Sequence, residues 1–131
     1  MIRAFKPADL DVLRDIHRKS GLPPQCLPDL TDPLYIVKIV QEEKGHVVQA
    51  GFVRTIGECY VMADHDYATP ERRWEIMQEL IISGLHAAAE KGIRDASCWL
   101  PPSLEKSFGA RLKTLGFQPS PWPCYSIILK D

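Results

Sequence analysis

The chain has 131 residues, the length of one ordinary domain, so we expect residues 1–131 to form a single domain around one core. Hydrophobic residues make up 45% and charged residues 25% of the sequence, which excludes a disordered or fibrous protein. The formal net charge of -1 argues against a nucleic-acid-binding protein and against attraction to an anionic membrane.

The first third of the chain predicts a short strand, a helix and a long loop. Residues 2–5 form the strand candidate, and residues 7–18 carry apolar side chains at helical spacing, namely Leu10, Leu13 and Ile16. Gly21 ends this helix. Residues 22–33 contain four prolines and are expected to form a loop that passes over the core.

The middle of the chain predicts an antiparallel meander. Residues 34–41 are dense in β-branched and aromatic side chains, residues 42–45 read as a hairpin turn, and residues 46–55 as the returning strand. Residues 58–67 follow as a third strand. We expect these three strands to pair in sequence order.

Two helices and two strands are predicted after the meander. Thr69 and Pro70 suit the start of a long helix that ends at Gly92. Its apolar side chains form a continuous stripe that is expected to face the core: Ile76, Met77, Leu80, Ile81, Leu85 and Ala88. Residues 93–100 form a strand candidate, residues 104–115 a second amphipathic helix, and residues 124–130 a final strand. The long helix makes a crossover, so residues 58–67 and 93–100 should be parallel neighbours.

The resulting order is β-α-β-β-β-α-β-α-β. It predicts an α/β (α+β) fold with a mixed, mostly antiparallel sheet and helices on both faces.

This order resembles the GNAT superfamily of acetyl-CoA-dependent N-acetyltransferases. Residues 2–10 (IRAFKPADL) look like the family's opening strand and its entry to the first helix. Residues 44–52 (KGHVVQAGF) look like the meander turn and its returning strand, and residues 115–117 (LGF) resemble the exit from the last helix. The resemblance covers nearly the whole chain.

The resemblance implies acetyl-CoA as the cofactor, bound at the end of the third meander strand and at the start of the long helix. The glycine-rich pyrophosphate loop of the family falls on residues 72–77, where Glu75 and Met77 occupy its two glycine positions. The tyrosine that serves many members as general acid is matched by Leu112. The cofactor-binding residues implied in this chain are Tyr67, Arg72, Arg73 and Trp74.

Asp64, His65 and Asp66 are the candidates for a general base that accepts a proton from an amine. Histidine suits this task best near neutral pH. Because side chains alternate along a strand, His65 and the two aspartates should point to opposite faces. The alternative interpretation is a polar strand end that leads into a loop.

Two functions remain open. In the first, the chain is an N-acetyltransferase that transfers an acyl group from acetyl-CoA to a small-molecule or peptide amine. In the second, it is a catalytically degenerate GNAT-fold domain that binds another small ligand or a protein partner. Under either function the chain could form a homodimer.

The remaining features predict a cytoplasmic protein without a metal site. The N-terminal residues are too charged for a secretory signal, and no apolar run is long enough for a membrane helix. The four cysteines show no closely spaced metal-ligand pair and are expected to be free thiols.

Overall fold

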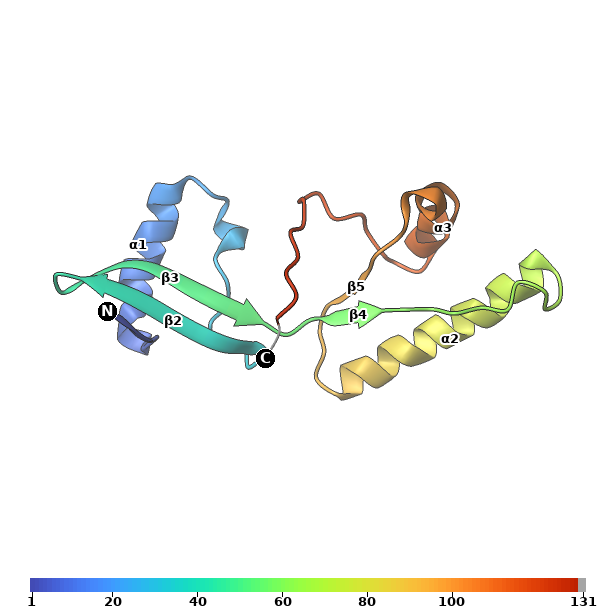
Figure 1. The fold of residues 1–131 in the computed structure, drawn as a ribbon. Helices are drawn as coiled ribbons and strands as arrows, with labels where there is room; N and C mark the ends of the chain where they lie inside the picture. The colour runs from blue at the N-terminus through green and yellow to red at the C-terminus, as the bar shows by residue number, and fades with distance from the viewer. Residues whose placement is uncertain (130–131) are drawn as a thin grey trace. The chain divides into compact units, whose positions relative to one another are not determined.

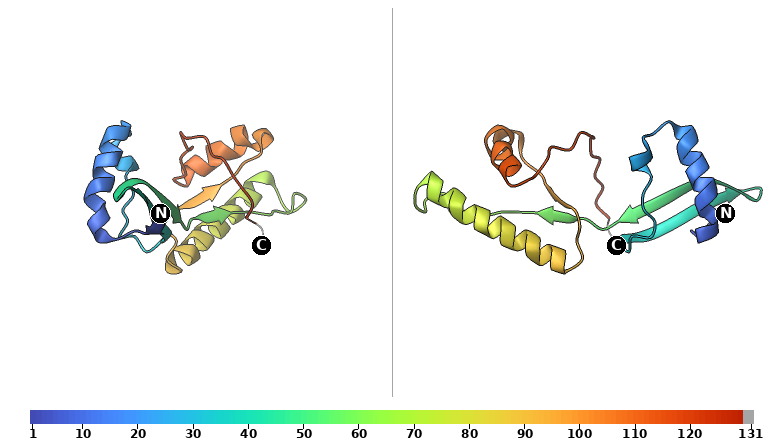
Figure 2. Two further views of the ribbon diagram at one scale, coloured as in Figure 1. Left: turned by 60° about the vertical axis from the view of Figure 1, so that its left-hand side comes forward. Right: turned by 180° about the vertical axis from the view of Figure 1, so that it is seen from behind.

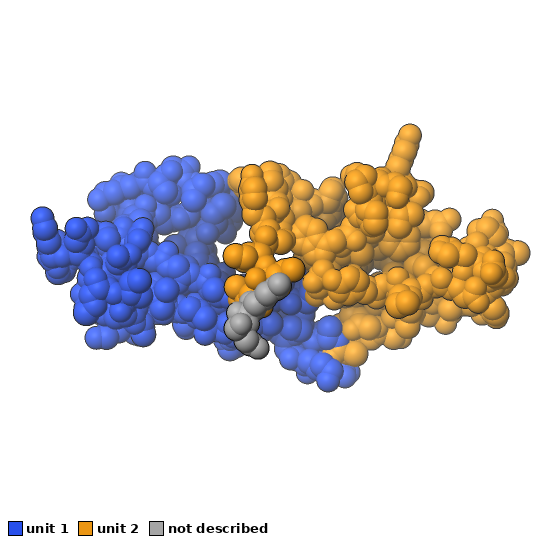
Figure 3. Space-filling view, in the orientation of Figure 1, with its two compact units in different colours: residues 1–57, 88–96 blue, residues 58–87, 97–131 orange. Residues whose placement is uncertain are grey.

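The computed structural model describes residues 1–129 of the chain (Figure 1). It divides into two compact units (Figure 3). Unit 1 contains residues 1–57 and 88–96, and unit 2 contains residues 58–87 and the residues from 97 onward. Both helices and strands are present, as predicted, and the strands form two separate sheets.

Unit 1 contains a three-stranded antiparallel sheet in the order β1-β2-β3. A hairpin of two long strands forms most of it, and the short first strand pairs with the outer edge of β2. The strands are β1 (Ile2–Ala4), β2 (Tyr35–Glu43) and β3 (His46–Arg54).

The hairpin turn is tighter than the sequence predicts. Only Lys44 and Gly45 lie between the strands, with φ of 51° and 79°, while the predicted turn also took in Glu42 and Glu43. Two successive residues with positive φ match the right-handed twist of the strands, which favours this turn in hairpins. Strand β2 therefore continues two residues further than predicted.

Helix α1 (Leu10–Ser20) lies across one face of the hairpin (Figure 2). A 3-10 turn over Pro7–Asp9 leads into it, and Gly21 ends it in the left-handed conformation with φ of 75°. A second 3-10 turn, Pro24–Cys26, interrupts the predicted loop. The core of unit 1 forms where the helix, the loop and the sheet meet, and its buried residues are Leu13, Leu30 and Val40.

A charge cluster fixes the start of α1 to the sheet. The guanidinium of Arg3 donates two hydrogen bonds to the carboxylate of Asp9, at 2.9 and 2.8 Å, and two more to Glu42 Oε1, at 2.9 and 2.7 Å. The Arg3 bonds lower the pKa of Asp9 to about 2. Two of the residues that carry the family resemblance therefore have a structural role here.

Strands β4 (Gly57–Cys59) and β5 (Ala96–Cys98) form a separate two-stranded sheet. The Gly57 amide donates a hydrogen bond of 2.8 Å to the carbonyl of Asp95, just before β5 begins. The starts of the two strands thus lie together, which makes the strands parallel neighbours, as predicted. The expectation that the third strand pairs with the second is wrong, because β4 pairs with β5 instead of β3.

Unit 2 is organised by α2 (Pro70–Glu90) and α3 (Pro102–Thr114). Ile81 of α2 and Leu112 of α3 are its buried apolar side chains. The rings of Trp74 and Phe108 meet edge to face with their centroids 6.1 Å apart. Leu112, which the sequence resemblance matches to a general acid, is a buried packing residue.

Three predicted strands are shorter or absent. The strand predicted over 58–67 ends at Cys59, and the one over 93–100 is reduced to Ala96–Cys98. Residues 124–129 form no strand, and residue 130 lies outside the described part of the chain. A strand needs a hydrogen-bonded partner, and Tyr125, Ile127, Ile128 and Leu129 are all more than four-fifths exposed.

Within the described residues, no helix is long and apolar enough to cross a membrane.

Candidate functional site

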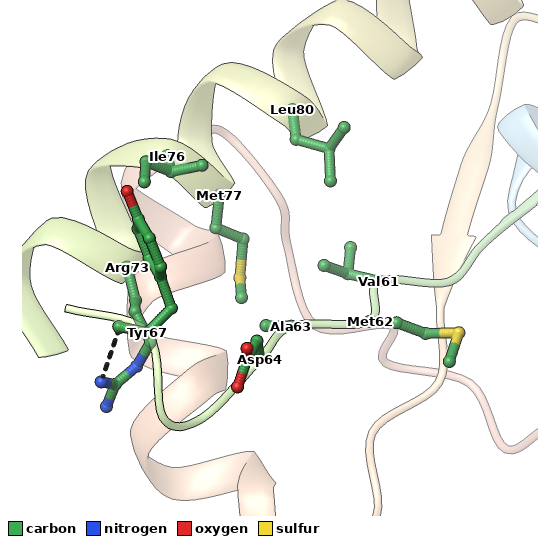
Figure 4. A pocket seen from close by; sticks show the side chains of 9 residues that line it. All are labelled: Val61, Met62, Ala63, Asp64, Tyr67, Arg73, Ile76, Met77 and Leu80. Atoms are coloured by element: carbon green, nitrogen blue, oxygen red, sulfur yellow. Dashed lines mark hydrogen bonds between the residues drawn. The ribbon is translucent and has the colours of Figure 1, made fainter.

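Unit 2 contains a pocket of about 350 Å³ between the segment that follows β4 and the first turns of α2 (Figure 4). This volume lies in the range of small-molecule sites. The segment supplies one wall and the helix the other. The lining residues are Val61, Met62, Ala63, Asp64, Tyr67, Arg73, Ile76, Met77 and Leu80.

A tight turn closes one end of the pocket. Asp64 Oδ1 accepts a hydrogen bond of 2.9 Å from the Asp66 amide, and the Asp64 carbonyl accepts one of 3.3 Å from the Tyr67 amide. A side-chain carboxylate that binds the backbone two residues later is typical of aspartate-initiated turns. Ala68 then takes a φ of 52°, which redirects the chain toward the helix.

Thr69 caps the start of α2, as the sequence predicts. Its Oγ1 accepts a hydrogen bond of 3.2 Å from the Arg72 amide, and its carbonyl accepts the first helical bond, 2.9 Å from the Arg73 amide. Pro70 is the first helical residue, where its missing amide hydrogen costs nothing. The cap fixes the angle at which the helix leaves the turn.

Arg73 links the turn to the helix. Its guanidinium donates a hydrogen bond of 3.1 Å to the carbonyl of Tyr67 (Figure 4) and one of 2.9 Å to the carbonyl of Ala68. These carbonyls belong to the turn, in which Ala68 has a positive φ, so Arg73 donates to acceptors that the helix does not reach. The side chain is therefore part of the pocket wall.

Arg72 is paired with Glu75 one turn along the helix, with Nη1 and Oε2 2.9 Å apart. The Glu75 carboxylate raises the pKa of Arg72. Both side chains are more than half exposed, so water competes with this ion pair.

Three of the seven residues predicted for the site line the pocket, namely Asp64, Tyr67 and Arg73. Four do not: His65, Asp66, Arg72 and Trp74. Trp74 packs instead between Phe108 and the guanidinium of Arg111, which lies 5.4 Å from its ring centroid.

The placement of residues 64–66 at a strand end is wrong. The strand stops at Cys59, and these residues lie in or beside the turn that precedes the helix. The alternation expected of a strand therefore does not apply to them. Of these three residues, Asp64 lines the pocket, and His65 and Asp66 do not.

The apolar lining is not among the predicted site residues. Ile76, Met77 and Leu80 follow Arg73 at helical spacing, a pattern that the sequence presents as a core-facing stripe. In the structure Leu80 is 57% exposed and Met62 is 95% exposed. Large apolar side chains that stay this exposed beside a pocket are the kind of surface to which ligands bind.

The chemical character of the pocket is apolar with three polar groups at one end. A ligand with a narrow apolar body would lie against the methionines and aliphatic side chains, while Asp64 would pair with a cationic or proton-donating group. Among residues 1–129, no three histidine, cysteine or acidic side chains gather in a way that would hold a metal ion.

Comparison with known proteins gives no relative: no family model, no curated protein and no solved structure matches this chain.

Proposed function

We propose that this chain is a GNAT-like N-acetyltransferase that binds acetyl-CoA in the unit 2 pocket and transfers its acyl group to an amine. The observation that carries the proposal is the position of the pocket. It lies between the segment after β4 and the first turns of α2, where the family resemblance implies the cofactor.

The lining supports an elongated ligand with an apolar section. Val61, Ile76 and Leu80 provide aliphatic surface for a pantetheine arm. Met77 occupies one of the family's glycine positions and lines the same pocket, so the ligand would pass beside a flexible thioether in place of bare backbone.

Asp64 is the residue best placed to act on the amine, because it is the one member of the predicted base group that lines the pocket. Its Oδ1 is held by the Asp66 amide, which orients the carboxylate. In the proposed reaction the amine nitrogen forms a bond to the acyl carbon, the carbon–sulfur bond breaks, and Asp64 takes the proton that the nitrogen loses.

A second function is favoured by the partners of the two arginines. Arg72 is bonded to Glu75, and Arg73 is bonded to two backbone carbonyls, so a pyrophosphate would have to displace existing bonds. Leu112, at the position matched to the general acid, has no proton to donate to the leaving thiolate. These features favour a domain that binds a small apolar ligand in the same pocket without catalysing acyl transfer.

Calorimetric titration with acetyl-CoA and with CoA tests the first function. Micromolar binding that a Leu80→Arg variant abolishes, with release of CoA thiol in the presence of an amine mixture, is the expected result. Absence of heat and of thermal stabilisation up to millimolar ligand would refute it.

Asp64→Asn separates chemistry from binding, and Asp66→Asn is its matched control in the same turn but outside the pocket. We expect Asp64→Asn to bind acetyl-CoA as the unmodified chain does and to lose at least about 100-fold in turnover, the usual contribution of a general base. Asp66→Asn should retain both. Equal turnover in the two variants would exclude Asp64 as the base.

A further inference from the structure

Two of the four cysteines lie at the ends of neighbouring strands. Cys59 is the last residue of β4, and Cys98 is the last residue of β5. The two strands are hydrogen-bonded neighbours and run parallel, because the amide of Gly57 bonds to the carbonyl that precedes Ala96.

The register brings the two cysteine side chains to the same side. A Cβ atom on Gly57 would lie 3.8 Å from the Cβ of Ala96, so these two positions face each other across the sheet. Each cysteine comes two residues later on its strand, and side chains repeat every two residues. Cys59 and Cys98 therefore lie level with one another on one face of the sheet.

The spacing suits a covalent link. Neighbouring strands are about 4.8 Å apart. A disulfide needs Cα atoms about 4.4–6.8 Å apart, which includes the spacing of neighbouring strands.

The surroundings of the two thiols also distinguish them from the other cysteines. Cys59 and Cys98 are half-buried, whereas Cys26 and Cys124 are exposed. Burial raises the pKa of the Cys98 thiol, and the nearby Cys59 raises it further.

We propose that Cys59 and Cys98 form an oxidisable dithiol, which a peroxide converts to an intramolecular disulfide between β4 and β5. One thiolate attacks the peroxide, takes one oxygen as a sulfenic acid, and releases water or an alcohol. The second thiol then attacks that sulfur, the disulfide forms, and a water molecule leaves. The two sulfur atoms together lose two electrons, and the peroxide gains them.

Peptide mapping under non-reducing conditions tests the proposal on the full chain. Trypsin places the four cysteines in four different peptides, and residues 55–72 and 95–106 carry Cys59 and Cys98. After brief treatment with hydrogen peroxide and blocking with iodoacetamide, we expect these two peptides to be linked. The monomer should lose two hydrogens, about 2 Da, and regain them with a reductant.

Three variants make the result specific. Cys26→Ser combined with Cys124→Ser retains the pair and should form the link to the same extent. Cys59→Ser and Cys98→Ser should each abolish it, and dimedone should capture the sulfenic acid that forms on the cysteine that remains.

Two outcomes would overturn the proposal. The first is oxidation of the exposed Cys26 and Cys124 under conditions that leave Cys59 and Cys98 unlinked. The second is a link that forms only between separate chains or only with Cys26 or Cys124. Circular dichroism of each variant confirms that the fold is retained, and peptide mapping of the unmodified chain decides between these outcomes without any variant.

Discussion

Leu13 and Leu112 form a matched pair for asking whether the two units unfold together. Each is 6% exposed, Leu13 in the core of unit 1 and Leu112 in unit 2. The boundary between the units falls inside β4, α2 and β5. A strand or helix that belongs to both units loses its own bonds when either unit unfolds, so we expect one cooperative transition.

The size of the effect follows from burial. Replacing a buried leucine by alanine removes apolar contacts and leaves a cavity, at a cost of about 2–5 kcal/mol. The neighbours of Leu13 include the partly buried Phe5 and Ile16, which have room to move into the space. We therefore expect a loss of about 3 kcal/mol. With a urea dependence of about 1.5 kcal/mol per M, the unfolding midpoint would fall by about 2 M.

Tryptophan fluorescence makes the test selective, because all three tryptophans belong to unit 2: Trp74, Trp99 and Trp122. Urea unfolding followed by fluorescence should show the same fall for Leu13→Ala as for Leu112→Ala. Circular dichroism should give coincident midpoints. Leu22→Ala, at a residue 53% exposed, is the control and should change stability by less than about 0.5 kcal/mol.

A fluorescence midpoint that stays unchanged in Leu13→Ala while the circular dichroism transition splits would refute this reasoning. The two units would then be independent domains, and the expectation of a single domain over residues 1–131 would be wrong.

Three further changes test local features. Because the pKa of Asp9 is lowered to about 2 from 3.8, its carboxylate stabilises the fold above about pH 4, and this contribution is lost as the pH falls toward 2. Asp9→Asn should therefore lower the melting temperature at neutral pH, and the melting temperature of the variant should fall less steeply between pH 4 and pH 2. Gly57→Ala places a methyl group 3.1 Å from Ile93 Cγ2 and should cost about 1 kcal/mol in urea unfolding. Glu75→Gln removes the ionic partner of Arg72 and should tighten CoA binding in calorimetry, with a stronger dependence on salt.

The local structure of this chain is well encoded in short stretches of sequence. Helix α2 begins at Pro70, as predicted, and the cap at Thr69 is confirmed by its hydrogen bond. Helix α3 covers most of the predicted residues 104–115 but begins two residues earlier, at Pro102. The β2–β3 hairpin follows from β-branched runs on either side of Lys44 and Gly45. These features depend on contacts between residues close in sequence, which a pattern can report.

Features that depend on distant partners are predicted poorly. Residues 124–129 have the composition of a strand, but composition does not supply the neighbour that a strand must bond to. The same limit explains β4, whose pairing with β5 follows from the crossover of α2 while its end at Cys59 has no local signal. The three polar residues that line the pocket are among the predicted site residues. The apolar residues of α2 that line it are predicted from the sequence to face the core instead.

The start of α2 shows why residue type alone does not define an anion site. Two arginines meet there, yet their partners give them different roles. Releasing Arg73 breaks two hydrogen bonds, to the carbonyls of Tyr67 and Ala68, which tie the helix to the turn that closes the pocket. Releasing Arg72 breaks only an exposed ion pair, which is worth little in water. Arg72 is therefore the arginine that an incoming phosphate can recruit, and Arg73 is the residue that holds the pocket in shape.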